Sequence, residues 1–509
     1  MLTTIHSMGL LGLHAYPVQI EIDLSHGMCS FEIVGLPDAA VKESRDRVRS
    51  AIKNCGFRFP SQKIIINLAP ADIKKTGPLY DLPLLIGLLQ ASGQISFDLN
   101  NTVFLGELSL GGKVRHITGA LPMITAARDL GFQQAFLPKQ NALEAGVVRG
   151  ISAFGVSHVE ELLQHLEGRK KLTPARYRPQ PKKADADLPD FSDVKGQLVP
   201  RRALEIAAAG NHNLLLIGPP GSGKSMLAKR LPSILPTMSF REAVETANIY
   251  SVAGLMDEEQ PLSLERPFRS PHHTISSAGL AGGSMPPRPG EISLAHNGVL
   301  FLDELPEFRR DVKEILRQPM EDDNITLARS SYHITYPCSV MVVAAMNPCP
   351  CGYYGHPTRE CRCSSNKVMN YLSKVSGPFL DRLDLHVEVS PVEYDSFRSA
   401  AKAESSQVIR KRVEKVRQLQ QQRYQSCPFS TNGRMTSSAI QRYCPLSEKA
   451  HQTLKFAFEK LGLSARAHNR ILKLARTIAD LEYSEQIEQP HIAEAIQYRS
   501  LDRKYWSPF

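Results

Sequence analysis

Apolar residues recur with two different periods in residues 1–166. Short apolar or alternating runs at 18–22 and 63–68 predict β-strands, whereas apolar positions at helical spacing predict helices over 39–54 and 82–92. The mixture predicts an α/β domain at the start of the chain.

A second α/β unit is predicted over residues 190–395. Three apolar runs, 213–217, 299–302 and 340–346, are each followed by glycine or polar residues. Continuous apolar runs of this length are typical of parallel strands that are buried on both faces. Polar residues at the ends of such strands are candidates for ligand binding, because ligands bind at the carboxyl ends of parallel strands.

The remaining residues form a linker and a helical region. Residues 167–189 are rich in proline, lysine and arginine and have no apolar period, which predicts an extended linker. Residues 396–509 carry helical patterns, and apolar positions between 471 and 481 predict a helix that begins near Ser464.

The chain has 509 residues and a formal net charge of +10. A basic balance suits a nucleic-acid partner, since cations placed against phosphates release counterions. However, seven basic residues and no acidic one lie between Arg169 and Lys183, within the linker. A solvated spacer is therefore the alternative explanation for much of the charge.

Two absences in the sequence suggest where the protein acts. No run of about 18 uncharged apolar residues is present, and residues 1–13 lack the basic segment of a secretion signal. Nine cysteines without such a signal argue against a disulfide framework. We expect a cytoplasmic protein with no membrane partner, in which a cysteine cluster indicates a metal site or packing.

One segment matches the phosphate-binding pattern G-x-x-x-x-G-K-[ST] at every specified position. Its glycines let backbone N–H groups turn toward phosphates, Lys224 can neutralise the β and γ oxygens, and the Ser225 hydroxyl can bind Mg²⁺. A helix is expected from Ser225 to Arg230, ended by Pro232. The predicted nucleotide-binding residues are Gly218, Pro219, Pro220, Gly221, Ser222, Gly223, Lys224 and Ser225, together with Asp303 of the next motif.

The run 299–302 ends in the acidic pair that such a loop requires. Asp303 is expected to bind the Mg²⁺ ion with Ser225, and Glu304 to activate the attacking water. Together the two motifs predict an enzyme that hydrolyses ATP. Asn347, after the run 340–346, is placed to hold the water or the γ-phosphate, and the alternative is an asparagine that caps the turn before Pro348.

Two polar segments carry less specific signals. Residues 325–336 alternate between apolar and polar on both sides of Arg329, which predicts a hairpin that projects from the sheet with Arg329 at its tip. For His272 and His273 the sequence indicates no role beyond a turn.

Four cysteines form two close pairs, Cys349 with Cys351 and Cys361 with Cys363, and His356 lies between the pairs. Four thiolates can bind zinc in tetrahedral geometry. The spacing is Cys-x-Cys rather than the commoner Cys-x-x-Cys, so a reduced, solvent-facing loop is the alternative to a structural zinc site.

The N-terminal domain resembles the proteolytic domain of the Lon family. The resemblance rests on segments 41–44, 74–78 and 106–114. In that family a serine and a lysine act at positions that Leu79 and Leu121 occupy here, and an isobutyl group can neither attack a carbonyl nor take a proton. The resemblance implies the Lon-type (S5-like) fold without protease activity, which argues against an ATP-dependent protease.

Segment 193–197 resembles the segment that closes over adenine in AAA+ ATPases, and segments 269–274 and 290–298 resemble the magnesium-chelatase branch of these proteins. With a Lon-like domain ahead of the motor, the whole chain is similar to the ComM/YifB group of that branch. The resemblance implies an AAA+ core in 190–395 and a helical connector and lid domain in 396–509.

The same resemblance assigns roles to three arginines. Arg382 would be the arginine finger that reaches a neighbour's γ-phosphate, although a local salt bridge with its flanking aspartates is the alternative. Arg466 would be the sensor 2 arginine at the start of a lid helix, with Arg470 as its rival one turn later. Arg329 would carry the charge of the hairpin into a central channel, as in replicative helicases of the minichromosome-maintenance type.

The ComM/YifB resemblance implies a DNA motor that forms a homo-oligomeric, hexameric ring. Such a motor would couple ATP hydrolysis to branch migration of recombination intermediates on single-stranded and branched DNA, as in natural transformation. The alternative is a magnesium-chelatase-like ATPase that remodels a protein partner. ATPase activity stimulated by DNA would distinguish the two.

Overall fold

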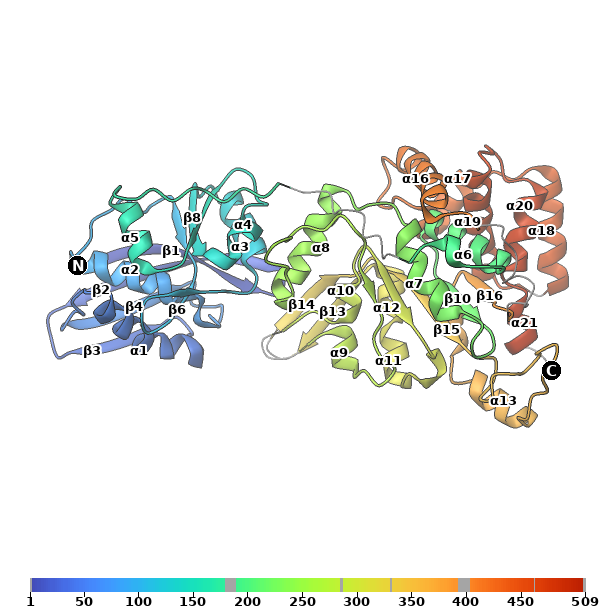
Figure 1. Cartoon of the computed structure of the whole chain (residues 1–509), viewed down its shortest axis with the longest axis horizontal. Helices are drawn as coiled ribbons and strands as arrows, with labels where there is room; N and C mark the ends of the chain where they lie inside the picture. Colours follow the sequence, from blue (N-terminus) through green and yellow to red (C-terminus); the bar gives the residue numbers. More distant parts are fainter. Residues whose placement is uncertain are drawn as a thin grey trace.

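The structure, a computed structural model, describes residues 2–178, 189–283, 287–329, 332–391, 403–461 and 463–506. An N-terminal domain, a second α/β domain and a set of C-terminal helices follow one another along an elongated molecule (Figure 1). We call the second domain the motor domain, after the family that its sequence resembles. The middle of the predicted linker, which includes Lys182 and Lys183, lies outside the described residues, and so does the expected boundary between 395 and 396.

A seven-stranded mixed sheet forms the centre of the N-terminal domain, in the order β3-β4-β2-β1-β5-β8-β9. Strands β1, β2 and β4 pair antiparallel, and the outer strands pair in parallel with their neighbours. The strands are β1 (Leu2–Leu11), β2 (His14–Ser25), β3 (Ser30–Val34), β4 (Lys63–Ala69), β5 (Thr102–Phe104), β8 (Gln134–Pro138) and β9 (Ser152–Val156).

Both faces of this sheet are covered by helices. Phe104 and Phe136 face a core that also contains residues of α1, α2 and α5, whereas Val103 and Leu137 face a second core that contains residues of α3. The predicted α/β character of the domain is confirmed. The helices are α1 (Ala39–Asn54), α2 (Asp81–Ala91), α3 (Ala120–Asp129), α4 (Ala142–Ala145) and α5 (Val159–Leu166).

The motor domain is built on a five-stranded sheet in the order β11-β12-β15-β10-β16, with every pair parallel. All residues of β10, β12 and β15 are buried, as the three apolar runs predict. The expected parallel sheet is therefore confirmed. Its strands are β10 (Leu214–Ile217), β11 (Phe268–Arg269), β12 (Val299–Leu302), β15 (Met341–Met346) and β16 (Leu385–Glu388).

Helices cover both faces of the motor sheet. The helices α6 (Leu198–Gly210) and α7 (Lys224–Ile234) share a core with one face, and α9 (Ser277–Ala281) and α11 (Arg310–Ile315) share a core with the other. The expectation that Pro232 ends the helix after the phosphate-binding loop is wrong, because α7 contains Pro232 and continues to Ile234. A proline removes only one helical hydrogen bond, and here it lies in the last turn.

The C-terminal region is helical, as predicted. Helix α19 begins where expected, with the Ser464 hydroxyl accepting a hydrogen bond from the Ala467 N–H at 3.2 Å. Among the described residues, no helix has the length and apolar character needed to cross a membrane. The helices are α16 (Ser406–Arg423), α17 (Ser437–Tyr443), α18 (Glu448–Leu461), α19 (Ala465–Leu481), α20 (Gln489–Gln497) and α21 (Leu501–Trp506).

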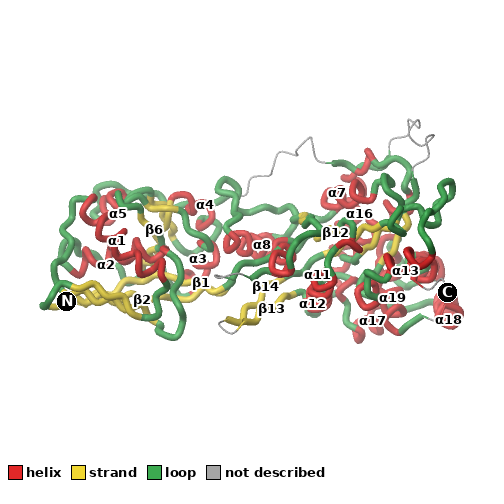
Figure 2. Tube along the Cα trace, turned by 90° about the horizontal axis from the view of Figure 1, so that it is seen from below, coloured by secondary structure: helices red, strands yellow, loops and turns green. Residues whose placement is uncertain are grey.

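The predicted hairpin is present and consists of β13 (Asn324–Arg329) and β14 (Tyr332–Pro337). It extends from the motor domain and lies beside the C-terminal end of β1 (Figure 2). The Ile334 side chain lies so close to Gly12, in the β1–β2 turn, that a Cβ atom at Gly12 would come within 2.4 Å of it. The hairpin is thus supported from the N-terminal domain as well as from the motor.

Helix α8 (Phe240–Ala253) of the motor packs on helix α3 of the N-terminal domain. The Ser251 carbonyl accepts a hydrogen bond from the Gly119 N–H at 3.0 Å, and its hydroxyl donates to the buried carboxylate of Glu144. Met238 and Ala247 belong to the same apolar core as residues of α3. The two domains are therefore joined through a shared core as well as through the chain.

Candidate active site

Three predicted motifs meet at one edge of the motor sheet. The phosphate-binding loop follows β10, the acidic pair follows β12 and Asn347 follows β15, which lies between those two strands. Because all three strands are parallel, their carboxyl ends lie side by side. We call this edge, with residues 218–225, Asp303, Glu304 and Asn347, the phosphate edge.

The backbone of the loop is shaped for a phosphate. Gly223, immediately before α7, has a φ of +92°, a conformation that glycine adopts without strain. A Cβ atom at Gly218 would come within 2.2 Å of the Val389 carbonyl oxygen. The loop therefore requires these glycines, and it leads into the N-terminus of an 11-residue helix, where N–H groups and the helix dipole favour an anion.

Lys224 lies at the centre of the phosphate edge. Its ammonium group donates to the Gly218 and Pro219 carbonyl oxygens, both at 2.8 Å, and to Asn347 Oδ1 at 3.2 Å. Burial lowers the pKa of Lys224 to about 8, and the charge of Asp303 only partly opposes this effect. The contact with Asn347 brings two residues together that are 123 positions apart in the sequence.

Ser225 and Asp303, the predicted pair of Mg²⁺ ligands, lie in direct contact. The Ser225 hydroxyl donates to Asp303 Oδ2 at 2.6 Å, and Asp303 Oδ1 accepts the Glu304 N–H at 3.0 Å. Two oxygen ligands this close suit Mg²⁺, which keeps several waters and takes its remaining ligands from nucleotide phosphates. The donor set therefore fits ATP with Mg²⁺.

Two cavities, of about 520 and 450 Å³, lie in the motor and its helical neighbours, and they are at different edges of the motor sheet. The larger one, of about 520 Å³, lies between segment 196–200, the end of β16 and the segment 497–501. The Gln197 side chain, at its rim, donates to the Ser222 carbonyl oxygen of the loop at 3.2 Å and to that of Ser390 at 2.6 Å. A nucleoside placed here would be next to the phosphates, and its apolar wall includes Leu198 and Val199.

The smaller cavity, of about 450 Å³, lies at the opposite edge of the motor sheet and collects the predicted arginines. Asn213, just before β10, accepts the Val342 N–H at 2.9 Å and donates to the Arg382 carbonyl oxygen at 3.1 Å. These contacts place Arg382 at the amino ends of the strands. Arg466 and Arg470 line the same cavity, which we call the arginine cavity.

The contacts within the arginine cavity differ between the three arginines. Arg382 pairs with Glu321 at 2.6 Å, and among the described residues its buried Nε has no hydrogen-bond partner. Arg470 pairs with Asp384 at 3.3 Å. Arg466 is exposed and forms no ion pair with any described residue. Although burial opposes ionisation of Asp384, the adjacent His212 ring, 3.5 Å away, and the charge of Arg470 keep the pKa of Asp384 well below its usual range.

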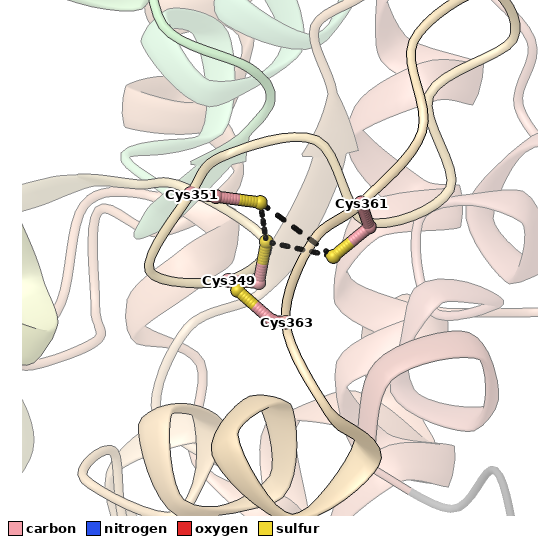
Figure 3. Close-up of side chains that lie close together, drawn as sticks. All are labelled: Cys349, Cys351, Cys361 and Cys363. Carbon is pink, nitrogen blue, oxygen red and sulfur yellow. Dashed lines mark hydrogen bonds between the residues drawn. The ribbon is translucent and has the colours of Figure 1, made fainter.

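The four cysteines come together after Asn347 (Figure 3). The Sγ atoms of Cys349, Cys351 and Cys361 are 3.4–3.6 Å apart, and those of all four cysteines lie within 4.8 Å of one another. Four thiolates bound to one zinc ion at about 2.3 Å would be about 3.8 Å apart. The cluster is consistent with a zinc site.

The cysteine loop also supports the phosphate edge. A Cβ atom at Gly352 would come within 2.3 Å of Pro220 in the phosphate-binding loop. The loop that carries the thiolates therefore lies directly against the backbone that would hold the nucleotide.

Arg329 is the last residue of β13, paired with Tyr332 of β14, so its backbone lies at the end of the hairpin. Its side chain and Ser330 lie outside the described part of the chain. On the N-terminal domain, Leu121 is fully buried and Leu79 is half-buried against the same core. The Leu121 N–H is hydrogen-bonded to Glu144 at 3.0 Å and lies 3.4 Å from the Ser251 hydroxyl of α8.

Sequence reasoning missed one contact at the phosphate edge. His273 Nδ1 lies 3.2 Å from Glu304 Oε2. The segment that contains His273 follows β11, and β11 is the parallel neighbour of β12. The two strands end at the same edge, but only the observed strand order reveals that they are neighbours.

The fold and the phosphate edge together define a P-loop ATPase domain followed by a helical domain. Three family models match the chain: "Magnesium chelatase, subunit ChlI" over residues 190–397, "Subunit ChlI of Mg-chelatase" over 20–141 and "Magnesium chelatase, subunit ChlI C-terminal" over 403–499. The motor therefore carries a magnesium-chelatase-type AAA+ ATPase domain.

Curated relatives extend the match to the whole chain. "Uncharacterized protein YifB" of Salmonella typhimurium is 44% identical over 504 residues, which cover 99% of this chain and 98% of that protein. "Competence protein ComM" of Haemophilus influenzae is 44% identical over 509 residues, with the same coverage of 99% and 98%. The chain belongs to the YifB/ComM family of magnesium-chelatase-like ATPases. A weaker, local similarity links it to "Lon protease 2" of Bacillus subtilis, 28% identical over 128 residues that cover 25% of this chain and 22% of that protein.

Proposed function

We propose that this protein is a cytoplasmic, ring-forming AAA+ motor that hydrolyses ATP to move DNA and promotes branch migration of recombination intermediates. The observation that carries the proposal is the separation of the phosphate edge from the arginine cavity. Each subunit would supply the nucleotide-binding half of one site and the arginine half of the next, as in a hexameric ring.

The positions of the arginines support action between subunits. A strand of four residues spans about 13 Å, so Arg382 and Arg466 lie at the wrong end of the sheet to serve the phosphates of their own chain. In a ring, the arginine cavity of one subunit would face the phosphate edge of its neighbour. There Arg382 would stabilise the transition-state charge, and Asn347 and Glu304 of the neighbour would orient and activate the water. Ser225 and Asp303 of that neighbour would hold Mg²⁺, which would neutralise phosphate charge.

Arg466 is a better candidate than Arg470 for the second arginine of this composite site. The charge of Arg470 is already balanced by Asp384, whereas Arg466 is exposed and has no ionic partner among the described residues. A guanidinium without a partner is free to bind an incoming phosphate. Arg470 would instead hold the wall of the cavity.

The hairpin supports DNA as the partner. Arg329 ends β13 at the outer end of a structure that extends beyond the sheet, and the relative from Haemophilus influenzae carries the name of a competence protein. A guanidinium at that position would bind backbone phosphates of single-stranded or branched DNA independently of sequence. The N-terminal domain, with leucines where Lon-type catalysis needs serine and lysine, would have a Lon-like fold and act without protease activity.

A magnesium-chelatase-like ATPase that remodels a protein partner is the second candidate, because the family models carry that name. The composite ATPase site would be the same in both. The cysteine cluster would hold structural zinc in either case.

The deciding experiment measures ATPase activity with single-stranded, duplex and branched DNA beside a control without DNA. We expect DNA to stimulate hydrolysis. We also expect Arg329→Ala to weaken DNA binding and to lower the salt slope by about one unit for each phosphate that is no longer neutralised, with basal hydrolysis intact. Arg241→Ala, which removes an exposed arginine of α8, is the matched control. If none of the three kinds of DNA stimulates hydrolysis, and both variants bind DNA like the parent, the proposal of a DNA motor is wrong. The protein-remodelling function then takes its place.

A further inference from the structure

Arg382, the predicted arginine finger, is bound by a carboxylate of its own subunit. Its Nη2 atom lies 2.6 Å from Glu321 Oε1, and both residues line the arginine cavity. The Arg382 side chain is 7% exposed, whereas the Glu321 side chain is 53% exposed. The carboxylate therefore covers the guanidinium on its solvent side, from which the phosphate of a neighbouring subunit would have to approach.

The ion pair uses only part of the guanidinium. Arg382 Nη1 donates to the Pro378 carbonyl oxygen and Nη2 binds Glu321, while the buried Nε has no hydrogen-bond partner among the described residues. Nε and Nη2 form one edge of the guanidinium, and a phosphate can accept hydrogen bonds from both atoms of such an edge. An incoming γ-phosphate would thus supply the missing partner of Nε, but only after Glu321 has left Nη2.

Glu321 is also connected to the base of the hairpin. It belongs to α12 (Arg317–Asp322), and only Asp323 separates this helix from β13. Arg434 holds this connection together, since it donates to the Met320 carbonyl oxygen at 3.1 Å and pairs with Asp323 at 3.0 Å. A ligand that moves the hairpin therefore acts on the segment that carries Glu321.

We propose that Glu321 is a positioning residue that holds Arg382 within its own subunit and releases it to the neighbour's γ-phosphate when DNA moves the hairpin. The inference rests on the proposed DNA motor and on Arg382 as its arginine finger. Arg382 stabilises the transition state, and Glu321 competes with that transition state for the same guanidinium nitrogen. Contact of one subunit with DNA would in this way set the rate of hydrolysis in the site that it shares with its neighbour.

The first experiment measures kcat without DNA, and the Kd of a fluorescent ADP analogue, for the parent and two variants. Glu321→Gln removes the charge and keeps the size of the side chain, and it should raise kcat about threefold to tenfold, the effect of losing one half-exposed ion pair. The Kd for ADP should not change, because ADP has no γ-phosphate for Arg382 to bind. Glu314→Gln is the matched control, since it breaks a pair with Arg317 at the start of α12 and should keep the parent rate.

A second experiment tests whether Glu321 acts on the neighbouring site. Glu304→Gln subunits should bind ATP without hydrolysing it, so rings that mix them with parent subunits report hydrolysis in the parent sites only. Adding Glu321→Gln to the Glu304→Gln subunits should raise the rate per parent subunit above that of the mixture with Glu304→Gln alone. Equal rates in the two mixtures would show that Glu321 does not act across the interface, which would overturn the proposal.

A third arm adds single-stranded DNA, which should stimulate Glu321→Gln by a smaller factor than the parent, because the restraint is already absent. A kcat of Glu321→Gln that equals or falls below the parent value, or an equal rise in Glu314→Gln, would also overturn the proposal. A parent that hydrolyses no ATP would instead overturn the proposed function. A parent that hydrolyses ATP but does not respond to DNA would remove DNA as the trigger, and the comparison without DNA would still decide whether Glu321 restrains Arg382.

Discussion

Nucleotide affinity should fall with rising pH because of the buried ammonium group of Lys224. Its side chain is 8% exposed, and burial lowers its pKa from 10.5 to about 8. A bound phosphate interacts with the charged form of Lys224, so nucleotide binding raises the pKa of this group. Nucleotide affinity therefore reaches its full value only below about pH 8. The sign is therefore a loss of affinity above that pH.

The size of the effect follows from the fraction of Lys224 that is protonated. With a pKa of about 8, that fraction falls from about 0.9 at pH 7 to about 0.1 at pH 9, so the apparent Kd should rise about tenfold. A lysine with an ordinary pKa would stay almost fully charged over the same range. The charge of the nucleotide phosphates changes little over this pH range, because their second ionisation, at a pKa of about 6, is nearly complete above pH 7.

The assay is an equilibrium titration with a fluorescent ADP analogue between pH 7 and 9.5, at constant ionic strength and Mg²⁺ concentration. Lys224→Arg is the control, since a guanidinium stays charged throughout and its Kd should not follow the same curve, whatever its absolute value. A parent Kd that is constant up to pH 9 would refute the reasoning, because Lys224 would then keep its charge despite burial.

Two further predictions test the composite site and the cysteine cluster. Arg382→Ala should keep nucleotide affinity and lower turnover about 10³-fold. Mixing Arg382→Ala subunits with Lys224→Ala subunits should restore part of the activity. If the mixtures are as inactive as either variant alone, both groups act within one subunit. Purified protein should contain about one zinc ion per chain, lost together with much of the nucleotide affinity in a Cys361→Ser and Cys363→Ser double variant. If metal analysis detects no zinc in protein produced with adequate zinc, the four cysteines form a reduced loop and not a zinc site.

The elements of the two α/β domains could be predicted because their apolar periods are unambiguous. The runs at β10, β12 and β15 are continuous, and burial on both faces is what such runs require. Pro232 misled the prediction of α7, because a proline in the last turn breaks only one hydrogen bond and packing of Leu231 and Ile234 in the core outweighs it.

Contacts between distant segments could not be predicted in the same way. The pairing of His273 with Glu304 depends on β11 lying next to β12, and the arginine cavity depends on α19 packing beside the start of β16. Strand order and helix packing are settled by the whole core, and no local period encodes them. The motifs indicate which residues take part in the chemistry. Only the fold shows that the phosphate-binding residues and the arginines lie at two different edges of the motor sheet.

The shared core between α3 and α8 has a practical consequence for how the protein can be divided. Met238 and Leu262 of the motor are 4% and 1% exposed, and the apolar cover over them includes residues of the N-terminal domain. A fragment cut within residues 179–188 would leave that surface bare to water, and exposed apolar patches promote self-association. The two halves are better regarded as a single folded body whose parts are connected once by the chain. A soluble isolated motor domain will therefore need polar side chains engineered onto the face of α8 that now contacts α3.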